Sequence, residues 1–169
     1  MKLNGLIYSL PKELKLLIAA FIIVLSIGFV TGLLFVGETT SIDPTGIEEQ
    51  YLGNESDEEA TVMKFKKSER EMLTLIHNHI LSMSIIFFLV GLIFSTTKLN
   101  RGLKIFLLTE PFVSVILTFG SLYFLWKGIN WTSYIVIFSG TLMTLSYSMM
   151  CLIILYQLSV SSKINSEMN

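Results

Sequence analysis

The sequence is poor in the residues that build most catalytic and metal centres, with one cysteine and two histidines among 169 residues. A lone cysteine, Cys151, can form no disulfide within the chain and offers no cysteine cluster for zinc or an iron–sulfur centre. Hydrolase motifs and phosphate-binding loops are also absent. No basic patch supports nucleic-acid binding. These absences leave enzyme activity undecided, but they favour a role without catalysis.

Charged residues are nearly missing from four apolar runs, which cover residues 14–36, 73–95, 105–126 and 132–158. A helix of about 20 apolar residues crosses the hydrocarbon of a bilayer. The runs lack the period-two alternation of membrane β-barrel strands. The first run is too long for a signal-peptide core and no cleavage site follows it, so we expect it to be retained. We therefore predict an all-α protein, a single membrane domain over residues 1–169 that forms a four-transmembrane-helix antiparallel bundle in the lipid bilayer.

The distribution of charge predicts the orientation of this bundle. All but three of the 13 acidic residues lie between residues 37 and 72, which predicts a long acidic outer loop. Positive charges near span ends stay in the cytoplasm. Such charges occur before or at the start of the first run and between the second and third runs, at Lys2, Lys12, Lys15, Lys98, Arg101 and Lys104. We expect a bacterial inner membrane protein whose N and C termini are both cytoplasmic.

The acidic loop contains signals for helices of its own. Asp43 followed by Pro44 is typical of a helix start, and Gly53 is a suitable end for that helix. The polar segment from Thr61 to Met72 is compatible with a helix. We expect it to continue directly into the second span.

Small residues at four-residue spacing mark two helix-packing seams. Gly28 and Gly32 form one seam on the first span, and Gly140, Thr144 and Ser148 form the other on the fourth. Small residues let helix backbones approach closely in lipid. Two interpretations stay open, because the seams could hold the bundle together or join copies of the chain into a homo-oligomer.

The second span begins with two histidines, His77 and His79. The apolar run after them, Ile80–Phe94, is too short to cross the membrane, so both histidines are drawn to its outer edge. At about 100° per residue their side chains point some 200° apart, and one helix cannot clamp a single ion with both. Met83 lies one turn below His79 and is a soft potential ligand. The alternatives are histidines bonded to head groups, a haem or metal site, and proton handling.

A second polar intrusion is Glu110 in the third span, followed by Pro111. In one interpretation these residues begin the helix, where a proline in the first turn and a carboxylate are both favourable. In the other, Glu110 starts a polar stripe along the helix that continues through Ser114, Thr118 and Ser121. If the stripe faces His77 or His79, it resembles a proton path.

Three segments resemble an uncharacterised family of small inner-membrane proteins of Bacteroidetes-type and other bacteria. They are Gly46–Gly53, His77–Ser84 and Glu110–Phe112, and the resemblance covers about residues 45 to 158. Related sequences often carry a histidine before the tyrosine of the first segment, where this chain has Gln50. The resemblance implies a place near respiratory proteins and no established activity.

Three functions follow from these features. The first is a respiratory or redox-associated accessory protein that binds haem or copper through His77, His79 and Met83. The second is a structural or assembly subunit that contacts a membrane protein partner through its acidic loop and small-residue seams. The third is a proton-coupled carrier, for which four short spans leave little room unless the protein dimerises.

Overall fold

The chain forms helices throughout the part of it that the structure, a computed structural model, describes: residues 3–40, 43–55 and 62–167. The elements are η1 (Leu6–Ser9), α1 (Lys12–Thr39), α2 (Pro44–Leu52), α3 (Glu69–Ser95), α4 (Arg101–Trp126) and α5 (Thr132–Glu167). No strand occurs within these ranges. Four helices, α1, α3, α4 and α5, are long and apolar enough to cross a membrane. The prediction of an all-α protein with four transmembrane helices is confirmed.

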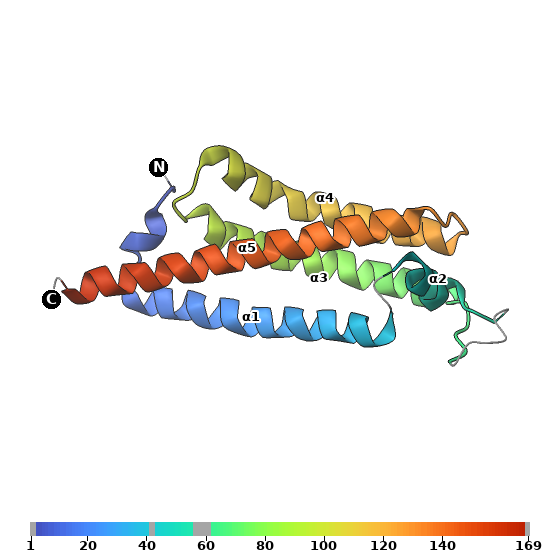
Figure 1. The fold of residues 1–169 in the computed structure, drawn as a ribbon. Helices are drawn as coiled ribbons and strands as arrows, with labels where there is room; N and C mark the ends of the chain where they lie inside the picture. The colour runs from blue at the N-terminus through green and yellow to red at the C-terminus, as the bar shows by residue number, and fades with distance from the viewer. Residues whose placement is uncertain (1–2, 41–42, 56–61, 168–169) are drawn as a thin grey trace.

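The four long helices lie side by side, with α2 at one end of the bundle and η1 at the other (Figure 1). The closest packing is between α4 and α5, and α3 packs against both of them. α1 lies along α5 and buries only a small share of its surface in the chain. Large apolar side chains on the outside of all four helices are exposed, as expected for helices that face lipid.

The short helix α2 forms as its sequence predicts. The Asp43 side chain accepts a hydrogen bond from the backbone N–H of Gly46 at 2.6 Å, and Gly53 ends the helix at a φ of 85°. A β-carbon at Gly53 would lie 2.8 Å from the backbone nitrogen of Lys66, so the chain approaches this glycine very closely. A glycine is therefore required there on two grounds, its positive φ and the lack of space.

The expectation that residues 61–72 continue into the second span as one helix is wrong. Residues 62–67 are not helical, and α3 begins only at Glu69. This segment instead bonds to the end of α2, with the Asn54 N–H donating to the Lys64 carbonyl and the Lys67 N–H donating to the Tyr51 carbonyl. Ser68 then caps α3 in a capping box with Glu71.

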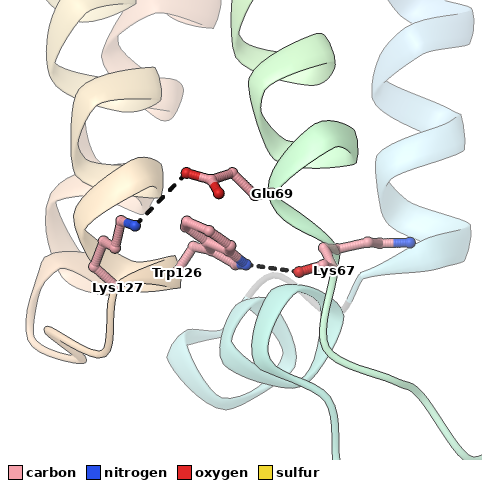
Figure 2. Close-up of polar contacts among 4 residues, drawn as sticks. All are labelled: Lys67, Glu69, Trp126 and Lys127. Carbon is pink, nitrogen blue, oxygen red and sulfur yellow. Dashed lines mark hydrogen bonds and ion pairs between the residues drawn. The ribbon is translucent and has the colours of Figure 1, made fainter.

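Two polar contacts tie the end of α4 to the start of α3 (Figure 2). The indole N–H of Trp126 donates to the Lys67 carbonyl at 2.8 Å, and the Lys127 ammonium lies 3.9 Å from the Glu69 carboxylate. Trp126 is buried, so its hydrogen bond is well protected, whereas the ion pair is exposed and contributes little. At the α2 end of the bundle, the buried indole of Trp126 thus connects the end of α4 to the segment that leads into α3.

At the opposite end, the connection between α3 and α4 is held by hydrogen bonds from other parts of the chain. The Gln157 side chain of α5 bonds both backbone groups of Lys98, at 2.8 and 2.9 Å. The backbone N–H groups of Gly5 and Ile7 donate to the Thr96 carbonyl. α4 then starts at Arg101, four residues earlier than the apolar run that predicted it.

Candidate functional site

Glu110 lies inside α4 and not at its start. Asn100 caps the helix, so Glu110 follows nine residues after the first helical residue, about 13 Å along the axis. Pro111 is consequently an interior proline. The interpretation in which Glu110 and Pro111 begin the helix is wrong, because helix formation extends through the basic segment that precedes the apolar run.

The Glu110 carboxyl is buried, with 6% of the residue exposed. One carboxyl oxygen, Oε1, accepts a hydrogen bond from the Ser114 hydroxyl one turn along the helix. The other, Oε2, is buried with no hydrogen-bond partner among the described residues. Pro111 has no N–H to donate to the Leu107 carbonyl, so a second oxygen on this face lacks its helical donor. Oε2 of Glu110 is thus a buried oxygen with unused bonding capacity, within about one turn of a carbonyl that Pro111 leaves without its usual helical donor.

No basic side chain occurs at the depth of Glu110. The central parts of the four spans, residues 16–37, 80–97, 105–126 and 132–160, contain no Lys, Arg or His, and Glu110 is their only acidic residue. An unpaired carboxylate in such a medium costs several kcal/mol or more. The physical alternatives for this group are a bound proton or a bound cation.

The whole predicted stripe is buried, and one of its residues, Thr118, bonds α5. Glu110, Ser114, Thr118 and Ser121 are each at most 8% exposed. The Thr118 and Ser139 hydroxyls lie 2.7 Å apart across the α4–α5 interface. Ser139 donates its proton to the Ile135 carbonyl at 2.6 Å, so Thr118 is the donor between the two hydroxyls. The stripe is thus part of a hydrogen-bonded helix interface.

The stripe does not meet the histidines. His79 packs against Phe119 of α4, with ring centroids 5.0 Å apart. Glu110 and Phe119 are nine residues apart, which places them on nearly opposite faces of α4 at about 100° per residue. The structure therefore separates the two polar features that the sequence allowed to be joined.

Both histidines are exposed on α3. The Nδ1 atom of His79 lies 2.8 Å from the Leu75 carbonyl, and His77 makes no hydrogen bond within the described ranges. Met83 is partly buried against the core. No group of three or more His, Cys, Asp or Glu side chains that could hold a metal occurs in the described part of the chain. A metal site with three or more such ligands would therefore need residues from outside the described part of the chain.

The two small-residue seams differ in their surroundings. A β-carbon added at Gly28, Gly32 or Gly140 would meet no atom within 4 Å apart from its own helix backbone and chain neighbours. Thr144 is half-buried and bonds its own helix at the Gly140 carbonyl, while Ser148 is exposed. The three glycines are therefore not required for close packing of the chain on itself.

Sequence reasoning missed several interior polar groups on α5, among them Ser139 and Tyr147. Thr132, Ser139 and Ser146 recur every seven residues and are all buried, a spacing that could have indicated the face that meets α4. The Tyr147 hydroxyl is buried without a hydrogen bond of normal geometry, and Ser26 and Cys151 are polar groups close to it. Its ring stacks on Phe29 of α1 at 4.1 Å between centroids.

Comparison with known proteins identifies the family of this bundle. The family model Aq_1264_TM, described as a transmembrane helical domain, matches residues 41–165. The chain belongs to this family. The match includes α2 to α4 and α5 up to residue 165, and with them Glu110, the polar stripe and both histidines. No curated protein and no solved structure matches the chain.

Proposed function

We propose that this family member is a proton-coupled membrane protein in which Glu110 binds and releases the proton. The observation that carries the proposal is the buried carboxyl whose Oε2 has no partner, at a depth without any basic side chain. Ionisable groups inside membrane bundles are rare and usually mark ion or proton pathways. A carboxyl kept only for packing would be expected to have both oxygens bonded.

The stripe supplies hydroxyl groups on one side of Glu110. Ser114 bonds the carboxyl directly, and Thr118 bonds Ser139 across the interface. These groups lead toward the α2 end of the bundle. Following the positive-inside rule, we propose that this end faces outward from a bacterial inner membrane and that both chain termini are cytoplasmic. Protons would then reach Glu110 from the outer side.

Labelling with a lipid-soluble carbodiimide tests the proton on Glu110. Such reagents attack carboxylic acids in their protonated form, and the adduct is located by mass spectrometry. We expect one adduct in the membrane helices, on Glu110, which disappears in Glu110→Gln. Glu69→Gln is the matched control, because Glu69 lies exposed at the start of α3 and its loss should leave the adduct unchanged. Absence of labelling at Glu110 over pH 5 to 9 contradicts the proposal.

Proton movement is measured in liposomes that contain a pH-sensitive dye. A cell extract of small molecules supplies the co-substrate. In its presence we expect the purified protein to dissipate an imposed pH gradient. Glu110→Gln should abolish this proton flux. The Glu69→Gln variant should behave as the natural protein. Equal flux in Glu110→Gln and the natural protein would refute a role for this carboxyl.

A second candidate function, the redox-associated accessory protein, is favoured by one feature of His79. Histidines that bind metals usually donate their other ring N–H to a backbone carbonyl, and Nδ1 of His79 has such a partner in Leu75. Its Nε2 is then left with a lone pair for a metal or haem iron. Absorption spectroscopy and metal analysis of gently purified protein test this function. We expect His79→Ala to remove the cofactor and His77→Ala to retain it, and a colourless, metal-free natural protein contradicts the idea.

A further inference from the structure

One face of α3 changes from polar to apolar along its length and is covered by no other helix. Arg70, Thr74 and Asn78 follow one another at four-residue spacing near its start. Below them on the same face, within an arc of about 80°, come four exposed apolar residues. They are Leu81, Ile85, Phe88 and Leu92, each more than 50% exposed. The face therefore has a polar head and an apolar tail.

The polar head of this face forms an open pocket of about 510 Å³. Its lining consists of Arg70, Glu71, Thr74, Leu75, Asn78 and His79. Within the described ranges, the side chains of Arg70, Thr74 and Asn78 make no hydrogen bond or ion pair. All three are hydrogen-bond donors, and the guanidinium alone has five N–H groups. The pocket thus collects donors that the protein itself does not use.

The other two polar side chains of the pocket are already engaged. The Glu71 carboxylate accepts from the backbone N–H and the hydroxyl of Ser68 in the capping box. The His79 ring has Nδ1 at the Leu75 carbonyl, so a neutral ring presents a lone pair at Nε2 and not a donor. The Glu71 carboxylate keeps its charge but is held at the helix start, so the free hydrogen-bond donors of the pocket are those of Arg70, Thr74 and Asn78.

The depth of these residues matches the layers of a bilayer. α3 has 27 residues and is about 40 Å long, which equals the thickness of a bilayer with its head groups. Arg70 then lies at the level of the head groups and Thr74 at the boundary of the hydrocarbon. Asn78 lies about 6 Å deeper, and the exposed apolar residues follow within the hydrocarbon.

We propose that this face of α3 binds one phospholipid with an anionic head group. Arg70 binds the phosphate together with Thr74, Asn78 donates to an ester carbonyl of the glycerol backbone, and an acyl chain lies along Leu81 and Ile85. A free phosphate shares the chemistry of the head group but has no counterpart for Asn78 or the apolar stripe. This site is separate from Glu110 and does not depend on the proposed proton transfer.

Native mass spectrometry of the delipidated full chain in detergent tests the site. The probes are phosphatidylglycerol, phosphatidylcholine and inorganic phosphate, titrated separately. We expect phosphatidylglycerol to bind with the highest affinity and Arg70→Ala to weaken it about fivefold, the effect of one basic residue near a membrane surface. Asn78→Leu should weaken both lipids, and Arg70→Lys should keep part of the preference because it keeps the charge.

The matched control is Arg101→Ala, since Arg101 is an exposed arginine at the opposite end of the bundle. It should bind phosphatidylglycerol as the natural protein does. Equal losses in Arg70→Ala and Arg101→Ala would show that the lipid responds only to overall charge, and the site would be rejected. Binding of inorganic phosphate as tight as that of phosphatidylglycerol would also reject a lipid site. Circular dichroism confirms that each variant is folded.

Discussion

Replacing Glu110 by methionine should stabilise the bundle while it removes the proposed proton-binding group. Methionine is similar in length and adapts its shape to a core. The carboxyl oxygen Oε2 is buried without a partner, a condition that costs about 1–3 kcal/mol. The variant also loses the bond from Ser114, and such bonds in membrane proteins contribute about 0.6 kcal/mol. The expected net gain is about 0.5–2 kcal/mol in the free energy of unfolding.

Reversible unfolding in mixed micelles of a mild detergent and sodium dodecyl sulfate, followed by circular dichroism, measures this difference. The matched control is Leu107→Met, one turn earlier on the same helix, where the residue is 2% exposed and carries no polar side chain. A volume-conserving exchange of this kind costs less than about 1.5 kcal/mol. If Glu110→Met is less stable than Leu107→Met, the carboxyl is a satisfied structural group and the argument for a functional one fails.

Three further predictions concern other parts of the chain. A double-mutant cycle of Thr118→Val and Ser139→Ala should give a coupling energy of about 0.6 kcal/mol in the same unfolding assay, and a coupling of zero contradicts the interhelical bond. Gly53→Ala should destabilise the fold by at least about 1–2 kcal/mol, because its φ is positive and a β-carbon would clash with the backbone of Lys66. Gly28→Ala should be neutral or stabilise by up to about 1 kcal/mol, and equal effects of the two substitutions on the free energy of unfolding would contradict this prediction. Burial raises the pKa of Tyr51 above its ordinary value of 10.0, so stability is complete below that pH and falls as the pH rises above it. Tyr51→Phe should remove this loss of stability at alkaline pH. If the free energy of unfolding of the variant depends on pH as that of the natural protein does, the prediction is wrong.

Much of the fold could be predicted from the sequence because the signals are local. Lipid requires every backbone group to be bonded within the helix, so a long apolar run predicts a span without knowledge of its neighbours. The start of α2 at Asp43 and its end at Gly53 likewise depend on side-chain and backbone geometry within a few residues. The shared face of the four stripe residues also follows from spacing, since they recur every three or four positions on one helix, whereas their burial is a finding of the structure.

What the sequence by itself determined is therefore the helices and the presence of a polar stripe. The tertiary structure alone decided which neighbour the stripe meets. Thr118 bonds Ser139 on α5, while His79 packs on Phe119 at the other side of α4. It also decided that Pro111 is inside a helix and that residues 62–67 are not helical. Residues 62–67 bond to the end of α2 instead. The physical reason is that periodicity states which residues share a face, whereas the packing of whole helices selects the partner of that face.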